Sequence, residues 1–204
     1  MTKKILITGA NGQLGHEMRN ALKGNSRFEC IFTDVAELDI CNAEAVKQTI
    51  ADNHIDYIVN CAAYTQVDKA EDNTELCKKI NTDAVENLAR AAADYGARMI
   101  HISTDYVFNG RGYRPYTEDM VPDPQSVYGS TKLEGEKILT DICPESIIIR
   151  TAWLYSPYGN NFVKTMLHLG EEREELSVVA DQIGTPTCAA DLAQARSEER
   201  RVGK

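Results

Sequence analysis

The chain has 204 residues, of which 43% are hydrophobic and 26% are charged, and its formal net charge is −9. This composition is typical of a globular protein with one domain, or one domain and part of a second, and excludes disordered, collagen-like and coiled-coil chains. An acidic chain is a poor candidate for nucleic-acid binding. The sequence shows no apolar stretch of membrane-spanning length and no signal peptide, so neither a membrane partner nor export is expected.

The six cysteines and four histidines form no recognisable redox or metal motif. No two cysteines have the C-x-x-C spacing, and the histidines are scattered without an H-E-x-x-H pattern. We expect reduced thiols in a cytoplasmic protein, with a disulfide framework as the alternative. No metal site is assigned.

Short β-rich runs alternate with helical patterns along the whole chain. In chain order we predict a strand at 3–8, a helix at 14–22, a strand at 28–33, a helix at 43–51, a strand at 57–60, a helix capped by Asn81 or Thr82 and ended by Gly96, a strand at 99–103, a helix at 128–140, a strand at 147–150, a helix at 162–173 and a strand at 176–180. This alternation predicts an α/β fold, a Rossmann-like doubly wound parallel sheet with helices on both faces.

The order of these elements also indicates how the chain is divided. We predict a dinucleotide-binding domain at 1–150, followed at 151–195 by the last sheet elements and an incomplete, smaller substrate-binding part. The Gly-, Pro- and Tyr-rich segment 109–127 is a long loop, and loops of this length inside a compact domain are often functional.

The last nine residues, 196–204, have an unusual sequence. They read RSEERRVGK, a direct translation of AGATCGGAAGAGCGTCGTGTAGGGAAA, which resembles a common sequencing-library adapter. We therefore expect an adapter-derived tail and a natural reading frame interrupted near Ala195; the alternative is a charged, frayed terminus. Without the tail the chain has 18 basic and 29 acidic residues and a net charge of −11.

A glycine-rich turn follows the first predicted strand and begins the first helix. It reads Thr-Gly-Ala-Asn-Gly-Gln-Leu-Gly and contains Gly9, Asn11, Gly12 and Gly15. The absence of side chains at Gly9 and Gly12 lets backbone N–H groups approach a pyrophosphate at the positive end of a helix, and Gly15 lets the helix pack closely on the sheet. Asp34 ends the second strand, 19 residues after Gly15, where an acidic side chain can bind an adenosine ribose. This context predicts dinucleotide binding, and the negative charge of Asp34 favours NAD over NADP; a plain turn is the alternative.

A second pattern, Y-x-x-x-K, lies at Tyr128 and Lys132. Residues four apart share one face of a helix, and a lysine ammonium can lower the pKa of a neighbouring phenol. Thr104 lies at the carboxyl end of the fourth predicted strand, where doubly wound sheets bind ligands. The three side chains form a candidate site for carbonyl reduction, although Y-x-x-x-K alone also occurs on solvated helices.

The glycine-rich turn and the Y-x-x-x-K pattern together resemble the extended short-chain dehydrogenase/reductase superfamily. Further segments resemble the dTDP-4-dehydrorhamnose reductase family within it. They are VNCAAYTQVDKAE at 59–71, STDYVF at 103–108, RTAW at 150–153, NNFVKTM at 160–166 and DQIGTPT at 181–187.

This resemblance implies a reaction and a cofactor. Members of the family reduce the C4 ketone of dTDP-4-dehydro-β-L-rhamnose to dTDP-L-rhamnose with NADPH or NADH. Tyr128 would donate the proton, Lys132 would bind the nicotinamide ribose and tune Tyr128, and Thr104 would bond to the carbonyl or to Tyr128.

Further positions are carried over from the same resemblance. The cofactor pyrophosphate would lie against Gly12, Gln13 and Leu14, and its adenine against Asp39 and Ile40. The segment Ala62, Ala63, Tyr64 and Thr65 would border the ribose and nicotinamide. The dTDP-sugar would contact Val67, Asp105, Tyr106 and Trp153. Core packing of Trp153 and a loop-capping role of Asp105 are the alternatives.

Two other enzyme activities and one non-catalytic role fit these residues less well than reduction does. A related 4,6-dehydratase would need a glutamate where Tyr106 stands, and a 4-epimerase has no specific support. A non-catalytic relative, such as the reductase-like regulatory subunit of methionine adenosyltransferase, is disfavoured by the intact Thr104, Tyr128 and Lys132.

Members of the family are considerably longer than this chain, and their C-terminal part helps form the nucleotide-sugar pocket. We therefore expect the full-length protein to be active and this chain alone to be weakly active or inactive. Some relatives bind Mg²⁺ at a dimer interface, but no matching ligands are identified here. A homodimer is an assembly consistent with the resemblance.

Overall fold

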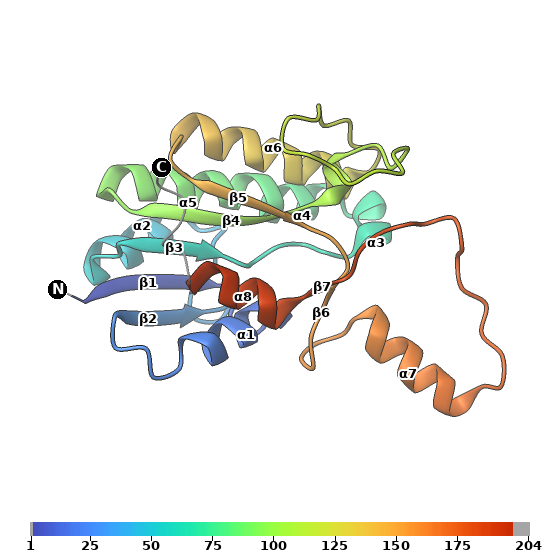
Figure 1. The fold of residues 1–204 in the computed structure, drawn as a ribbon. Helices are drawn as coiled ribbons and strands as arrows, with labels where there is room; N and C mark the ends of the chain where they lie inside the picture. The colour runs from blue at the N-terminus through green and yellow to red at the C-terminus, as the bar shows by residue number, and fades with distance from the viewer. Residues whose placement is uncertain (1, 198–204) are drawn as a thin grey trace.

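A computed structural model describes residues 2–197 of the chain, and its centre is a five-stranded parallel sheet (Figure 1). The spatial order of the strands is β2-β1-β3-β4-β5, and every neighbouring pair is parallel. Their bounds are β1 Lys3–Thr8, β2 Phe28–Thr33, β3 Tyr57–Asn60, β4 Arg98–Thr104 and β5 Ile147–Thr151. The strand order reverses between β1 and β3, which confirms the predicted doubly wound fold.

Helices cover both faces of this sheet. The bounds of the longer helices are α1 Gln13–Leu22, α2 Ala43–Asn53, α5 Ala84–Tyr95, α6 Val127–Ile142, α7 Phe162–Glu172 and α8 Ala189–Ser197. In Figure 1, α1 and α8 lie on one side of the sheet, and α2, α5 and α6 lie on the other. The sheet is therefore buried on both faces, as a parallel sheet requires.

Each side of the sheet has its own apolar core. Leu6 of β1 and Ile58 of β3 pack against α2, α5 and α6, whereas Ile5 and Ile7 of β1 pack against α1 and α8. Successive residues of a strand point to opposite faces, so a strand with two covered faces needs a continuous apolar run. The run Ile5 to Ile7 meets this requirement.

The predicted strand at 176–180 is wrong. These residues form an exposed, irregular segment between α7 and the next strand, away from the main sheet (Figure 1). Their β-branched side chains favour a strand locally, but no neighbouring strand pairs with them. The local sheet pair is instead β6 (Leu154–Tyr155) with β7 (Thr187–Cys188), two short parallel strands that the sequence pattern did not indicate.

The predicted cap at Asn81 or Thr82 is also wrong. Helical structure already begins with α3 (Val67–Asp72) and α4 (Thr74–Lys78) and runs through a π-helical turn, η1 (Lys79–Asp83), into α5. Both side chains are buried in that turn and bond to other segments, because tertiary contacts outweigh their preference for a helix start. Gly96 does end α5, in a left-handed conformation with φ of 70°.

The segment after β5 returns to the main domain. Ala189 and Ala193 of α8 are buried in the same apolar cluster as Leu14 and Met18 of α1. The proposed boundary at residue 150 therefore separates segments that share a core. Of the predicted adapter-derived tail, residues 198–204 lie outside the described residues. No helix within 2–197 is long and apolar enough to cross a membrane.

Two helical glycines give a test of how closely α6 must pack. A Cβ on Gly135 would lie 2.3 Å from the backbone oxygen of Asn81, whereas a Cβ on Gly170 in α7 would meet nothing within 4 Å. We expect Gly135→Ala to lower the free energy of unfolding by about 2 kcal/mol through overpacking. Gly170→Ala should raise it by up to about 1 kcal/mol. Urea unfolding followed by circular dichroism measures both, and equal effects would contradict the packing argument.

Candidate active site

The candidate site residues gather where β1, β3 and β4 end. The glycine-rich turn follows β1, the segment Ala62–Thr65 follows β3, and Thr104 is the last residue of β4. Because the three strands are parallel neighbours, these segments meet at one edge of the sheet. The topology thus brings together the two motifs, which are more than a hundred residues apart in the sequence.

The glycine-rich turn is shaped by close backbone contacts. Gly9 has a φ of +64°, and a Cβ there would lie 2.6 Å from the backbone nitrogen of Ala62. A Cβ on Gly15 would lie 2.4 Å from the backbone oxygen of Gly9. Gly12 begins α1 without any side-chain cap. The N-terminal N–H groups of α1 are therefore left for an anion, and the turn fits the pyrophosphate of a dinucleotide.

Asp34 is joined directly to this turn. Its carboxylate accepts hydrogen bonds from the backbone N–H of Asn11 at 2.9 Å and from that of Val35 at 2.9 Å. Asp39 and Ile40 follow in the same loop; Asp39 is exposed, and Ile40 is buried in the core. The negative charge of Asp34 thus lies beside the glycine-rich turn.

The side chain of Gln13 bonds to a distant part of the chain. Its amide bonds to the backbone oxygen of Leu154 at 3.4 Å and to the side chain of Asn161 at 2.9 Å. These bonds tie the turn to β6 and to the chain that follows it. The side chain of Leu14 is buried in the core. Any contact of Gln13 and Leu14 with the pyrophosphate would therefore come from their backbone groups.

Two buried asparagines hold the segment that follows β3. The Asn60 side chain accepts a hydrogen bond from the Ala62 N–H at 3.1 Å. The Asn81 side chain accepts one from the Tyr64 N–H at 2.9 Å and donates one to the Tyr64 oxygen at 3.1 Å. Neither role was predicted from the sequence; for Asn60 the signal was a polar residue at the end of an apolar buried strand.

Tyr128 and Thr104 are buried at the start of α6 and the end of β4. Burial raises the pKa of Tyr128 to about 12, and a hydrogen bond with the Thr104 side chain opposes that rise. The phenol is therefore protonated at neutral pH. Gly129 allows α6 to start here, because a Cβ at this position would lie against the backbone oxygen of Tyr106.

Lys132 is one of the most deeply buried side chains of the described residues, at 1% exposure. Its Nζ lies 2.5 Å from the backbone oxygen of Ile102 and 3.1 Å from Nε2 of His101. Burial lowers the pKa of Lys132 to about 8. The net shift of the Tyr128 pKa is nevertheless upward, because burial is its largest cause.

Three of the four residues expected at the sugar lie near Tyr128 or Thr104, whereas the Trp153 ring lies against Gly184. Tyr106 meets the Tyr128 ring edge-on, with ring centroids 5.6 Å apart. Val67 packs in the same small apolar cluster as Tyr128. Asp105 bonds to Thr104, and burial raises the pKa of the Asp105 carboxyl. Trp153 is 44% exposed, so core packing is not its role.

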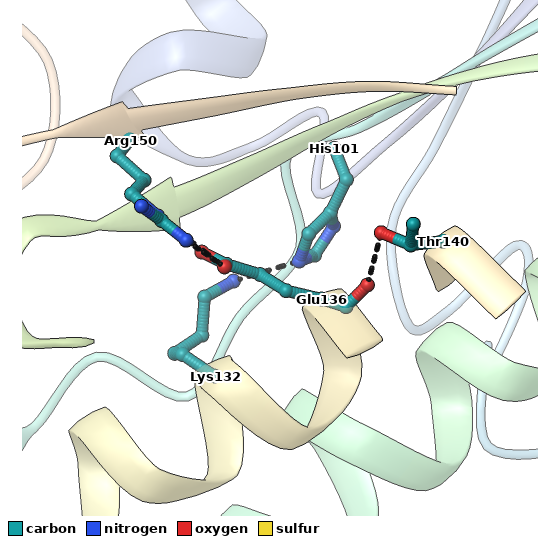
Figure 2. Close-up of polar contacts among 5 residues, drawn as sticks. All are labelled: His101, Lys132, Glu136, Thr140 and Arg150. Carbon is teal, nitrogen blue, oxygen red and sulfur yellow. Dashed lines mark hydrogen bonds and ion pairs between the residues drawn. The ribbon is translucent and has the colours of Figure 1, made fainter. Parts of the chain in front are cut away.

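A buried ion pair supports α6 beside the site (Figure 2). Arg150 of β5 donates to the Glu136 carboxylate through two nitrogens, at 3.0 and 2.6 Å, and the Glu136 side chain is 5% exposed. Figure 2 shows Lys132 and Glu136 projecting from the same helix toward the sheet. The pair fixes the register of α6 against β5. Within residues 2–197, no group of three or more potential metal-binding side chains is present.

The chain matches known proteins over nearly all of its length. The sequence pattern of the RmlD substrate binding domain family matches residues 3–198. A dTDP-4-dehydrorhamnose reductase of Escherichia coli K12 is 47% identical over 97% of this chain and 67% of its own length. One from Aggregatibacter actinomycetemcomitans is 46% identical over 93% of this chain and 65% of its own length. The chain thus spans about two thirds of these relatives.

Solved structures of similar sequence have the same fold. A dTDP-4-dehydrorhamnose reductase from Clostridium acetobutylicum superposes with a TM-score of 0.93 and 51% identity, over 96% of this chain and 69% of its own. One from Bacillus anthracis, solved in complex with NADP, superposes with a TM-score of 0.94 and 44% identity. The match covers 97% of this chain and 70% of that structure's chain.

The ion pair between α6 and β5 can be tested against an exposed one on β4. Arg150→Met leaves the buried Glu136 carboxylate without its partner, and we expect a loss of roughly 2–3 kcal/mol in unfolding free energy. The matched change Arg98→Met breaks a pair with Glu145 in which both side chains are exposed, and should cost less than about 1 kcal/mol. Chemical denaturation measures both. Equal losses would show that the buried pair does not support the helix.

Proposed function

Since this chain belongs to the RmlD substrate binding domain family, we propose that its protein is an NAD(P)H-dependent reductase. The substrate is dTDP-4-dehydro-β-L-rhamnose, and the product is dTDP-L-rhamnose. The observation that carries the proposal is the convergence of Thr104, Tyr128 and Lys132 beside the glycine-rich turn at one edge of the sheet. Relatives with 46 and 47% identity bear the name of this reductase.

The cofactor would bind across the ends of β1 and β3. The backbone of Gly12, Gln13 and Leu14 would hold its pyrophosphate, Asp34 its adenosine ribose, and Asp39 with Ile40 its adenine. The segment Ala62–Thr65 would border the nicotinamide. When bound, the reduced nicotinamide supplies the hydride.

Tyr128 holds the proton that the reduction requires. Its raised pKa keeps the phenol protonated at neutral pH, so the hydroxyl can donate to the C4 carbonyl oxygen as a hydride adds to the carbon. The ketone becomes an alcohol and Tyr128 becomes a phenolate. A buried phenolate is costly, and the ammonium form of Lys132 would stabilise it. Lys132 would also bind the nicotinamide ribose.

The substrate would lie over Tyr128 from the exposed side of the site. Thr104 would bond to the carbonyl oxygen or to Tyr128, which positions the two oxygens for proton transfer. Tyr106 and Trp153 expose aromatic surface suited to a sugar or a base and would contact the substrate, and Asp105 and Val67 would complete the contacts.

The proton-donor role predicts the effect of removing a single oxygen atom. Tyr128→Phe in the full-length protein should lower kcat by about a hundredfold or more, because general acid catalysis is lost while the ring still packs. Oxidation of NADPH with dTDP-4-dehydrorhamnose provides the assay. Tyr113→Phe, at an exposed tyrosine of the loop 109–127, is the matched control and should leave the rate unchanged. An undiminished rate in Tyr128→Phe would overturn the role, and wild-type protein without turnover would overturn the function.

The charge of Asp34 should influence the choice of cofactor. Asp34→Asn keeps a hydrogen-bond acceptor but removes the charge that would repel a 2′-phosphate. We expect NADPH affinity to rise relative to NADH by about five- to tenfold, the effect of about 1 kcal/mol of Coulomb energy in water. Fluorescence titration with both cofactors measures the ratio. Glu44→Gln, an exposed change on α2, is the control; an unchanged ratio in Asp34→Asn would exclude the carboxylate as a selector.

A further inference from the structure

His101 is a titratable side chain that the proposed reaction does not use. It lies on β4, is fully buried, and stands between two residues of the site. Its Nδ1 is 3.0 Å from Nδ2 of Asn60. Its Nε2 is 3.1 Å from Nζ of Lys132 (Figure 2). A buried imidazole in contact with a buried amine must have its protons arranged to suit both neighbours.

The orientation of the Asn60 amide decides this arrangement. Its Oδ1 accepts from the backbone N–H of Ala62 at 3.1 Å and from the hydroxyl of Thr8 at 2.6 Å. A backbone N–H can only donate, so the oxygen must face Ala62 and the amide nitrogen must face His101. Because that nitrogen is also a donor, Nδ1 of His101 must accept.

The tautomer of His101 follows from this contact. A neutral imidazole that accepts at Nδ1 carries its proton on Nε2, which here faces Lys132. A neutral Lys132 amine can accept that proton through its lone pair while donating its own hydrogen to the oxygen of Ile102. A Lys132 ammonium has no lone pair, so two donors would face each other across 3.1 Å.

We propose that His101 is a positioning residue that controls the charge of Lys132: held by Asn60 as the Nε2–H tautomer, it favours the neutral amine in the free protein. Formation of the ammonium then requires this contact to rearrange. The catalytic consequence rests on the proposed function, in which the charged Lys132 stabilises the Tyr128 phenolate.

The other groups around Lys132 act in the opposite direction. Glu136 on α6, Cys77 on α4 and Cys61 after β3 each raise the pKa of Lys132 electrostatically. Burial outweighs them and lowers that pKa to about 8. His101 would add to the effect of burial through a directional contact, so removing its Nε2 should favour the charged lysine.

The tautomer can be measured without any assay of activity. In the full-length protein labelled with ¹⁵N-histidine, the ring-nitrogen shifts of His101, assigned by comparison with His101→Asn, should show a protonated Nε2 and an unprotonated Nδ1. The spectrum is recorded above pH 8, where the Lys132 amine is neutral, and a protonated Nδ1 there would overturn the proposal. This result does not depend on which substrate the protein reduces.

The pH profile of turnover tests the effect on Lys132. Loss of the ammonium as pH rises should give wild-type kcat/KM, which reports the free protein, an alkaline limb near pH 8. His101→Asn keeps a group near the Nδ1 position and removes the one facing Lys132, and should move this limb upward by about one pH unit. His101→Gln places an amide N–H near the Nε2 position and should restore the wild-type limb.

The outcomes separate the two proposals. Superimposed pH profiles for wild type and His101→Asn would overturn the role of His101. A wild-type protein without turnover would instead overturn the proposed function, and the tautomer measurement alone would then decide the role of His101. If His101→Asn fails to fold, His101→Gln and the wild-type tautomer still decide: an Nδ1–H imidazole, or a His101→Gln limb displaced from the wild-type position, contradicts the proposal.

Discussion

The docking of α6 onto the sheet is the constraint on which the site depends. Three places along this helix allow close approach. Gly129 lies against the backbone of Tyr106, Lys132 bonds to the backbone of Ile102, and Gly135 lies against the backbone of Asn81. Each contact would be lost or strained if the helix moved outward. Tyr128 therefore reaches Thr104 because α6 packs closely against its neighbours along several turns.

Seating α6 this closely has an electrostatic cost. Burial raises the pKa of Tyr128 to about 12 and lowers that of Lys132 to about 8, so both shifts favour the neutral form. Charged groups are expensive to bury, and perturbed pairs of this kind cluster at functional sites. The arrangement suits a reduction in which the phenol starts protonated and must be stabilised only after it has lost its proton.

Local patterns predicted most of the main sheet and its helices. The apolar runs of β1 to β5 and the helical spacing of apolar residues in α1, α2 and α5 are visible in the sequence itself. The two errors arose where local preference met a different tertiary environment. Residues 176–180 favour a strand but have no strand to pair with, and Asn81 favours a helix start but bonds to Tyr64 from within a continuous helical run.

The candidate site divides in the same way. The glycine-rich turn, Asp34 and the Tyr128–Lys132 pair could be predicted from the sequence, because each depends on spacing within one short segment. The direction of the Tyr128 pKa shift, the contact of Gln13 with β6, and the contacts that run from Thr8 through Asn60 and His101 to Lys132 became visible only in the folded chain. The physical reason is that burial and hydrogen-bond direction depend on neighbours from distant strands and helices, which spacing along one segment does not encode.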